Sequence, residues 1–379
     1  MTADPVPLLQ SLIEIASVNP HLDRSASGES DIAAFCAEWL TARGFDVERL
    51  EAQPGRPSIV GVLRGTGGGR SLMLNGHLDT VAVASYRDEP FAARVQDGKV
   101  FGRGAFDMKG GLAAILTAAA RAAAEPRAGD LIVALVADEE FGSIGTAEVL
   151  TRYTADAAIV AEPSALELTL AHRGFAWFEV QFSGLAAHGS MPEQGVDAIA
   201  GASALLALVG ELRTRLEGMP RHPLLGHGAV RVATISGGVD AATVAPSCVL
   251  TLERRTLPGE TIDTVEAELR GLVAEAADSV PGLTATLTRL VGRGAFEADP
   301  DSRIVTTVSR AFAAVTGTAP AVRGEPFWTD AGLFAEAGIP CLVFGVDGGG
   351  AHADEEWATV ASVETLTDVL ERTIREFCG

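Results

Sequence analysis

Leu131-Ile-Val-Ala-Leu-Val-Ala137 is an unbroken apolar run, and Asp138-Glu139-Glu140 follows it directly. Such a run, in place of an alternating one, is typical of a strand that is buried on both faces of a sheet. Three further short apolar runs lie at 58–63, 71–74 and 157–160. A helical pattern at 110–124 lies between two of these runs. This alternation predicts an α/β domain with a mixed, largely parallel sheet.

The middle of the chain has a different pattern, which begins near Gly174. Residues 175–182 alternate apolar and polar side chains, as a half-exposed strand does. The next elements are predicted as a helix at 197–216, strands at 229–235 and 248–252, a helix at 264–277 and a strand at 283–290. The order β-α-β-β-α-β is that of a small two-layer α+β unit. We therefore predict a discontinuous α/β domain (1–173 and 291–379) with an α+β domain (174–290) inserted into it.

The composition limits the possible partners. Fifty acidic residues against 29 basic ones give a net charge of −21, which disfavours nucleic acid and anionic membrane surfaces. The four cysteines are far apart, and the amino terminus lacks the basic and apolar regions of a signal peptide. The longest stretch of small apolar residues, 111–124, contains Arg121 and is too short to span a bilayer. We expect a cytoplasmic protein with reduced thiols.

Histidines and carboxylates follow several of the predicted strands. His77 and Asp79 follow the run at 71–74, Glu139 and Glu140 follow Ala137, and Glu162 follows the run at 157–160. Three consecutive carboxylates after a buried strand repel one another unless a cation, protons or solvent compensates them. In open α/β sheets such strand ends are where ligands bind. A structural turn at His77 and a solvated loop at Asp138-Glu139-Glu140 are the alternatives.

Two further residues complete the candidate set. Asp107 lies in a glycine-rich loop near the start of a helix, where it is either a helix cap or a metal ligand. His352 follows a glycine run near the carboxyl terminus. The five side chains of His77, Asp107, Glu140, Glu162 and His352 suit a pair of zinc-like divalent ions that share one ligand. Two adjacent ions can activate water and polarise a carbonyl group.

Other enzyme classes lack their sequence signatures here. We find no GxGxxG after a strand, which argues against a nucleotide-binding dehydrogenase. We find no GxSxG, which argues against a serine hydrolase of the α/β type. The absence of HExxH excludes a thermolysin-like zinc protease.

The ordered motifs resemble those of the M20 metallopeptidases. The motifs are NGHLDT (75–80), GRGAFDMKGG (102–111), ADEEFG (137–142), AEPS (161–164) and AHADEE (351–356). This family includes acetylornithine deacetylase, succinyl-diaminopimelate desuccinylase, aminoacylase-1 and glutamate carboxypeptidase. The resemblance covers essentially the whole chain. It implies a zinc-peptidase-like catalytic domain and an inserted ferredoxin-like lid that forms a homodimer.

The resemblance also implies a role for each candidate residue. His77 and Glu162 would hold one ion, Glu140 and His352 the other, and Asp107 would bridge them. Asp79 would orient His77. Glu139 would be the general base that deprotonates the water between the ions. The metals would be zinc, with cobalt or manganese as alternatives.

In the lid, His188 resembles the histidine that reaches the partner subunit's active site and stabilises the tetrahedral oxyanion. Arg255 resembles the arginine that pairs with a substrate carboxylate, and Arg173 is a second candidate for that work. The alternatives are a loop histidine for His188 and an ordinary surface ion pair for either arginine.

The sequence departs from the family pattern at two places. The lid segment that often reads Asn-Val-Ile-Pro is Thr243-Val-Ala-Pro246, and Asp347 lies in the late loop that often carries Gly-Pro-Gly. Neither change affects a predicted ligand or the base, so we expect catalysis to be kept and substrate preference to shift. The resemblance implies removal of the acyl group from an N-acyl amino acid, as acetylornithine deacetylase does. An aminoacylase or a dipeptidase and carboxypeptidase activity on a dipeptide-like substrate is the alternative, and a non-catalytic binding protein is a remote one.

Overall fold

The computed structural model describes residues 4–379, which form two compact units. The larger unit contains the chain up to Leu170 with Ala298–Arg323 and Thr329–Gly379. The second, which we call the lid unit, contains Ala171–Glu297 and Gly324–Trp328. The sequence analysis assigned 324–328 to the larger domain. These residues join the lid unit because the Arg173 N–H donates to the Glu325 carbonyl (3.2 Å) and Trp328 Nε1 to the Gly294 carbonyl (3.0 Å).

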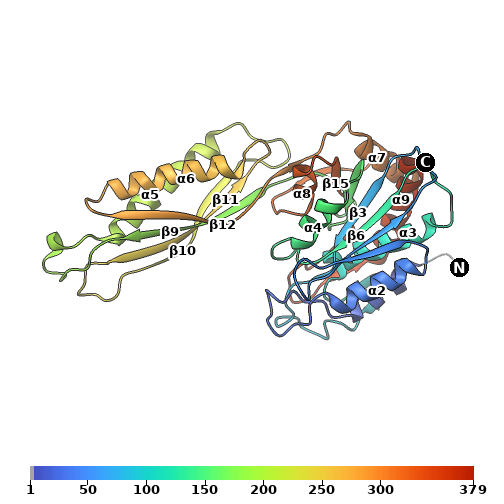
Figure 1. The fold of residues 1–379 in the computed structure, drawn as a ribbon, viewed down its shortest axis with the longest axis horizontal. Helices are drawn as coiled ribbons and strands as arrows, with labels where there is room; N and C mark the ends of the chain where they lie inside the picture. Colours follow the sequence, from blue (N-terminus) through green and yellow to red (C-terminus); the bar gives the residue numbers. More distant parts are fainter. Residues whose placement is uncertain (1–3) are drawn as a thin grey trace. The chain divides into compact units, whose positions relative to one another are not determined.

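The large sheet combines parallel and antiparallel pairs (Figure 1). Its strands are β1 (Asp46–Leu50), β2 (Ser58–Leu63), β3 (Leu72–His77), β6 (Leu131–Val136), β7 (Ala157–Val160), β8 (Leu168–His172), β13 (Phe296–Glu297), β14 (Val322–Glu325) and β15 (Cys341–Val343). They lie in the order β1-β2-β6-β3-β7-β15-β8-β13, with β14 beside β8. The central pairs β6–β3, β3–β7 and β7–β15 are parallel, and the outer pairs are antiparallel. The predicted mixed sheet is confirmed, with its parallel part at the centre.

Helices cover both faces of this sheet. They are α1 (Pro5–Glu14), α2 (Ser30–Thr41), α3 (Gly110–Ala122), α4 (Ile144–Arg152), α7 (Arg303–Thr316), α8 (Ala331–Glu336) and α9 (Val360–Cys378). Leu131, Val133 and Leu135 of β6 share one apolar core with α1, α2, α3, α7 and α9. Ile132 and Ala134 point to the opposite face and are also buried there, where α4 packs on β6. Burial on both faces explains why the apolar runs are unbroken.

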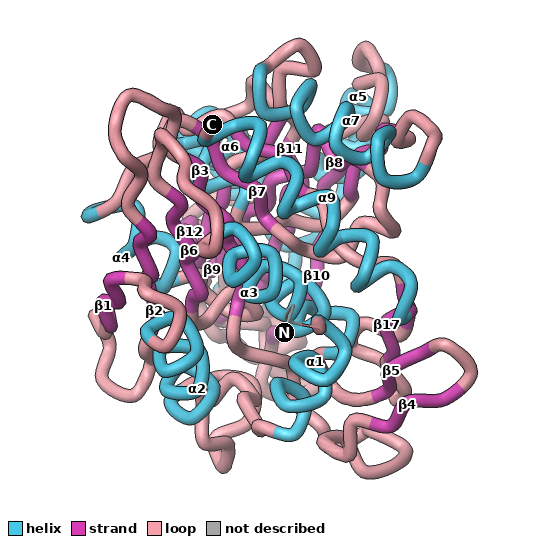
Figure 2. The backbone as a smooth tube through the Cα atoms, turned by 90° about the vertical axis from the view of Figure 1, so that its right-hand side faces the viewer, coloured by secondary structure: helices cyan, strands magenta, loops and turns pink. Residues whose placement is uncertain are grey.

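A small antiparallel sheet lies beside this core (Figure 2). It joins β4 (Arg94–Gln96), β5 (Lys99–Phe101), β17 (Trp357–Thr359) and β16 (Gly348–Gly349) in the order β16-β17-β5-β4. The Glu355–Glu356 segment directly precedes β17, and the Asp107 turn follows β5. The pairing of β17 with β5 therefore brings the two loops that carry Asp107 and His352 together.

The lid unit is a two-layer α+β structure, as predicted. Its strands β9 (Gly174–Ser183), β10 (Ala229–Gly237), β11 (Ser247–Thr256) and β12 (Thr284–Arg293) lie in the order β10-β11-β9-β12. Helices α5 (Ala198–Gly218) and α6 (Ile262–Asp278) cover one face of the sheet (Figure 1). Along β9, Phe178, Val180 and Phe182 are buried under these helices, whereas Trp177 is 41% exposed. Because β9 lies inside the sheet, β10 and β12 provide its edges.

Several elements were not predicted from the sequence, and α1, α4, α8, β1 and β8 are among them. β1 contains Asp46, Glu48 and Arg49 and has only one fully buried residue, Leu50. It therefore lacks the apolar signal of the central strands. Among residues 4–379, no helix is long and apolar enough to cross a membrane.

Candidate active site

The predicted site residues lie at the carboxyl ends of neighbouring parallel strands. His77 is the last residue of β3, Glu139 and Glu140 follow β6, and Glu162 follows β7. β3 lies between β6 and β7 and pairs with both in parallel, so these strand ends meet at one edge of the sheet. Asp107 comes from the turn that leads into α3, and His352 from the loop between β16 and β17.

Asp107 lies at the centre of the cluster. Its Oδ1 is 3.1 Å from His77 Nε2, and its Oδ2 is 3.3 Å from His352 Nε2. Glu140 Oε2 is 3.0 Å from His352 Nε2, and Glu162 Oε1 is 3.6 Å from His77 Nε2. The structure therefore brings the five predicted ligands together, in two halves that meet at the Asp107 carboxylate. Asp107 is not a cap of α3, whose N-cap position is occupied by Lys109.

Glu139 adjoins one half of this cluster. One ligand atom each from His77, Glu139 and Glu162 lie within 4.8 Å of one another, and so do atoms from His77, Asp107 and Glu140. The loop that carries Glu139 is not the solvated turn of the alternative interpretation, because its first residue, Asp138, is 1% exposed.

Asp79 contacts both His77 and the Glu139 loop, but with different atoms. The Asp79 carbonyl lies 2.8 Å from His77 Nδ1, whereas its carboxylate is 3.7 Å away. A proton on Nδ1 leaves Nε2 facing Asp107 as a potential ligand atom. The Asp79 carboxylate accepts hydrogen bonds from the backbone N–H groups of Glu139 (3.1 Å) and Glu140 (3.2 Å). Asp79 thus orients His77 through its main chain, and its side chain positions Glu139.

Burial and mutual repulsion shift the protonation of the cluster. Burial, and then the charge of Glu162, raises the pKa of Glu139 well above its usual value. Burial, and then the charge of Asp107, raises the pKa of Glu140 to about 7. Burial also raises the pKa of Glu162 well above the ordinary carboxyl value, against the opposing charge of His77. Hydrogen bonds to Asp107 and Glu140 raise the pKa of His352 to about 10.

The donor atoms fit two divalent cations. Imidazole nitrogens and carboxylate oxygens are ligands that zinc and related ions accept. Glu140 Oε1 is buried and has no hydrogen-bond partner among residues 4–379, which is costly unless a cation or proton compensates it. All four cysteines are buried and free, and none belongs to the metal-ligand groups among the described residues.

A buried network behind Asp79 was missed by the sequence analysis. Asn19 Nδ2 donates to Asp79 Oδ2 (2.7 Å) and to Asp138 Oδ1 (3.1 Å). Arg56 Nη2 donates to Asp138 Oδ1 (2.8 Å) and Glu29 Oε1 (2.6 Å), and all three of these side chains are at most 4% exposed. Asn19, Glu29 and Arg56 come from separate segments without a shared motif, so no spacing signal could have identified them.

Glu356 anchors the turn that carries Asp107. Its Oε1 accepts hydrogen bonds from the N–H groups of Phe106 (3.0 Å) and Asp107 (2.9 Å). Its Oε2 accepts from Gly104 N–H (2.9 Å) and from Arg103 Nη1 (2.8 Å). Arg103 and Glu356 are each 1% exposed. The final acid of the AHADEE motif, close to His352, was the available signal for this role.

Asp330 is a further buried carboxylate that the sequence analysis missed. It precedes α8 and accepts a hydrogen bond from Thr146 Oγ1 (2.5 Å). Burial raises its pKa to about 6, and its charge in turn raises the pKa values of Glu139 and Glu162. A single acid outside any motif gives no sequence signal.

The three predicted lid residues lie in different surroundings. His188 is exposed in a loop, where its Nδ1 accepts the Ser190 N–H (3.2 Å). Arg255 Nη2 lies 2.8 Å from Oε1 of Glu253, which is buried, so this pair differs from the surface ion pair of the alternative interpretation. Arg173 donates to the Leu225 carbonyl (2.6 Å) and lines a pocket of the lid unit.

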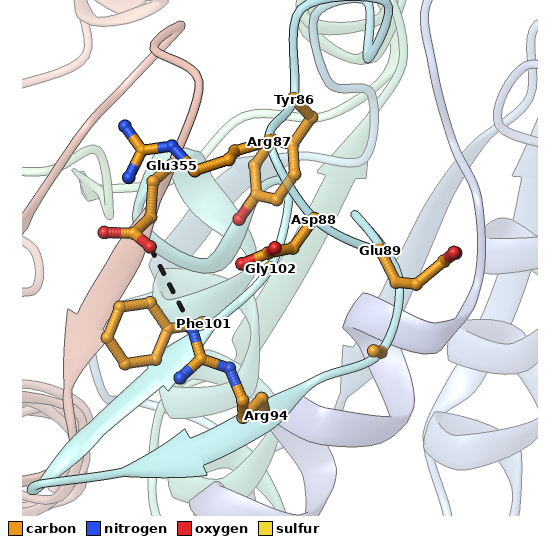
Figure 3. Close-up of a pocket in the computed structure, with 9 residues that line it drawn as sticks. Tyr86, Arg87, Asp88, Glu89, Arg94, Phe101, Gly102 and Glu355 are labelled. Carbon is orange, nitrogen blue, oxygen red and sulfur yellow. Dashed lines mark ion pairs between the residues drawn. The ribbon is translucent and has the colours of Figure 1, made fainter.

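The larger unit also contains a pocket of about 570 Å³ (Figure 3). It is lined by Tyr86, Arg87, Asp88, Glu89, Ala92, Arg94, Phe101, Gly102 and Glu355. None of the predicted ligands lines it. Its arginines face carboxylates, since Arg87 lies 2.7 Å from Asp354 and Arg94 lies 4.0 Å from Glu355. Because its cations are already paired, we assign it no part in the chemistry.

Residues 73–376 match the sequence pattern of peptidase family M20/M25/M40. The N-formyl-4-amino-5-aminomethyl-2-methylpyrimidine deformylase of Bacillus subtilis (strain 168) is 30% identical over 388 residues, which cover 93% of this chain and 91% of that protein.

Two solved structures are similar over nearly the whole chain. Aminopeptidase PepT from Bacillus cereus ATCC 10987 has a TM-score of 0.81 at 20% identity, covering 99% of this chain and 98% of that one. The Bacillus subtilis YXEP protein, described as a dinuclear metal binding peptidase, has a TM-score of 0.74 at 16% identity, covering 98% of each chain. At these identities the two likenesses show the fold. Because the family pattern spans most of the sequence and a relative is 30% identical over nearly the full length, the chain belongs to peptidase family M20/M25/M40 and is a metal-dependent hydrolase of C–N bonds.

Proposed function

We propose that this protein removes the acyl group from an N-acyl amino acid, as acetylornithine deacetylase does. The observation that carries the proposal is the position of Glu139, which has a carboxylate oxygen within 4.8 Å of ligand atoms of His77 and Glu162. A carboxylate beside a cluster of metal ligands is placed to act as a general base.

Two divalent cations, zinc or else cobalt or manganese, are proposed to occupy the cluster. His77 and Glu162 would hold one, Glu140 and His352 the other, and Asp107 would serve both. The two oxygens of Asp107, each close to a different histidine, support this division. The dinuclear description of the structurally similar YXEP protein also supports it. When bound, such ions make water a stronger acid and polarise the amide carbonyl.

Glu139 carries the proton in the proposed reaction. Its carboxylate accepts a proton from the attacking water and returns it to the nitrogen of the leaving amine. The hydrogen bonds from its backbone to Asp79 fix the loop from which the side chain projects. Burial raises its pKa, which makes the carboxylate a stronger base than an exposed glutamate.

His188 is proposed to stabilise the tetrahedral oxyanion. The Ser190 N–H donates to its Nδ1, so the proton of the neutral ring lies on Nε2. Nε2 can therefore donate a hydrogen bond to an oxyanion. Arg255 and Arg173 are the two candidates for a contact with the substrate carboxylate. The ion pair of Arg255 with Glu253 favours Arg173.

A second candidate is the removal of a formyl group from an N-formyl aminopyrimidine. It is favoured by the 30% identity to a protein named as a formylaminopyrimidine deformylase. Both candidates use the same attack on an amide carbonyl and differ in the acyl group and in the charge of the amine part. Aminoacylase or dipeptidase activity would use the same attack on an amide carbonyl with another preferred substrate.

A substrate panel on zinc-loaded protein tests the proposal. The panel contains N-acetylornithine, other N-acetyl amino acids, dipeptides and an N-formyl aminopyrimidine. The first candidate requires the highest kcat/KM on an N-acetyl amino acid, and the second requires it on the formyl compound. Absence of turnover on the whole panel by protein that has bound its metal would favour a non-catalytic binding protein.

We further propose that the protein is cytoplasmic and dimerises through the lid. The exposed apolar residues Ile199 and Leu206 of α5, Ile235 of β10 and Leu290 of β12 support a lid interface. Light scattering at working concentration tests the dimer, and a monomer would remove any role of His188 in a partner's site.

A further inference from the structure

A second concave site lies in the lid unit. It is a pocket of about 530 Å³, lined by Arg173, Arg221, His227 and the residues of the intervening turn. The lining residues, all within the described part of the chain, are Arg173, Arg221, Pro223, Leu224, Leu225, Gly226, His227 and Ala229. This lining contains basic side chains and no carboxylate, in a protein whose net charge is −21.

The turn at 222–226, which contributes lining residues to the pocket, is closed by hydrogen bonds. His222 N–H donates to the Gly226 carbonyl (2.8 Å), and Gly226 N–H donates to the His222 carbonyl (3.0 Å). His222 Nδ1 accepts the N–H groups of Leu224 (3.2 Å) and Leu225 (3.1 Å). Gly226 has φ +74°, a conformation that favours glycine. The pocket is therefore built on a defined backbone.

Two guanidinium groups face the same point above Gly226. A Cβ atom placed on Gly226 would lie 3.7 Å from Arg173 Nη2 and 3.7 Å from Arg221 Nε. Glycine leaves this point open, with one cation on each side. Two guanidinium charges that approach the same point repel each other unless an anion compensates them.

The pocket also holds polar atoms without partners. Arg173 Nε and His227 Nδ1 are both buried and have no hydrogen-bond partner among the described residues. The Arg173 guanidinium is also disfavoured in its charged form, because burial and then the charge of Arg255 lower its pKa. Other lid arginines differ, since Arg255 and Arg231 both pair with Glu253. Arg221 is exposed and has no ion pair among the described residues.

We propose that this pocket is an anion-binding site, in which Arg173 and Arg221 hold a carboxylate or phosphate group above Gly226 with His227 beside it. Guanidinium groups match the oxygen geometry of both anions and form charge-assisted hydrogen bonds with them. Arg173 is also a candidate for the substrate carboxylate under the proposed function, so the test separates a substrate carboxylate from a free anion.

The test measures how fast phenylglyoxal modifies Arg221 in the zinc-loaded protein, with inorganic phosphate as the probe and mass spectrometry to resolve each arginine. We expect saturating phosphate to slow the modification of Arg221 at least tenfold. Arg215, whose side chain is 54% exposed and faces Glu268, is the matched control and should keep its rate. In Arg173→Gln, the same protection should need at least tenfold more phosphate, with circular dichroism verifying the fold.

Equal effects of phosphate on Arg221 and Arg215 would overturn the proposal, and so would full protection at unchanged phosphate concentration in Arg173→Gln. If Arg173→Gln does not fold, His227→Leu replaces it, with the same expected loss of protection. The source of the anion is read from Arg221→Gln, a reading that rests on the proposed function. If the KM of this variant rises for a carboxylate-bearing amide and not for a neutral one, the site binds the substrate. If the ratio of the two KM values stays at the wild-type value, the site binds a free anion.

Discussion

The Asp79 carboxylate accepts a hydrogen bond from the backbone N–H of Glu139, 3.1 Å away. Its other oxygen accepts the N–H of Glu140 and the side-chain amide of Asn19. Asp79 itself is 1% exposed. One buried carboxylate thus fixes the loop that supplies both the proposed base and a proposed ligand, while its own carbonyl sets the ring of His77. Any change to this side chain should act on catalysis through position.

Replacing Asp79 by Ala should destabilise the protein and lower its activity. The change leaves the N–H groups of Glu139 and Glu140 without an acceptor, and each buried unsatisfied donor costs about 1–3 kcal/mol. We expect a fall of at least about 2 kcal/mol in the free energy of unfolding, measured with urea, and a lower kcat. Asp301→Ala, at an exposed turn, is the control. Unchanged stability of Asp79→Ala would contradict the positioning role.

Glu139→Gln should separate catalysis from metal binding. Glutamine keeps the shape of the side chain but cannot take a proton, so kcat should fall by about 10²–10⁴-fold. Metal content, measured by elemental analysis, should stay at the wild-type value. The neighbouring Glu140→Gln should instead lose metal, because Glu140 is a proposed ligand whose carboxylate lies 3.0 Å from His352. Full activity of Glu139→Gln would refute its assignment as the base.

The sequence predicted those parts of the molecule that have a local signal. The central strands are unbroken apolar runs because both of their faces are buried, and His77 and Glu162 follow such runs directly. β1 was missed because it is an edge strand with exposed charged residues. Its pairing with β2 depends on tertiary contacts and not on its own composition.

The supporting residues of the site could not be predicted for a related reason. Asn19, Arg56 and Asp330 are single polar residues, and only the folded chain brings them to the buried carboxylates. The lid arginines make the same point. The sequence favoured Arg255, but in the folded lid Arg255 pairs with Glu253, two residues away on the same strand, and the pocket that Arg173 lines contains no carboxylate.

Removing the metal should inactivate the protein and lower its melting temperature. Without cations, burial and then the charges of neighbouring acids disfavour the ionised forms of Glu139, Glu140 and Glu162, and their pKa values are raised accordingly. Ions that bind only the folded state stabilise it by mass action. Dialysis against a chelator should therefore abolish turnover and reduce the melting temperature, and added zinc should restore both. Activity that survives complete removal of the metal would contradict the metal site.

The metal-free protein should lose stability as the pH rises. The pKa of Glu140 is about 7 in the folded state against about 4.3 in the unfolded chain, so the folded state binds more protons between these values. The pKa of His352 is about 10 in the folded state against about 6.5 in the unfolded chain, so this group also makes stability fall as the pH rises between these values. Urea unfolding of chelated protein from pH 5 to pH 9 should show this fall, and saturating zinc should reduce it. A rise of stability over this range would contradict the shifts.

The adjacent residues Glu355 and Glu356 provide a matched pair of substitutions. Glu356→Ala leaves the buried Arg103 without a carboxylate, and loss of one partner of a buried ion pair costs about 3–5 kcal/mol. It also removes the acceptor for the N–H groups of Phe106 and Asp107, so the Asp107 carboxylate should lose its fixed position and metal affinity should fall. Glu355→Ala removes only a half-exposed partner of Arg94, and we expect a change within about 0.5 kcal/mol. Urea unfolding and zinc titration of both variants measure the difference, and equal behaviour of the two would contradict the role of Glu356 as the anchor of the Asp107 turn.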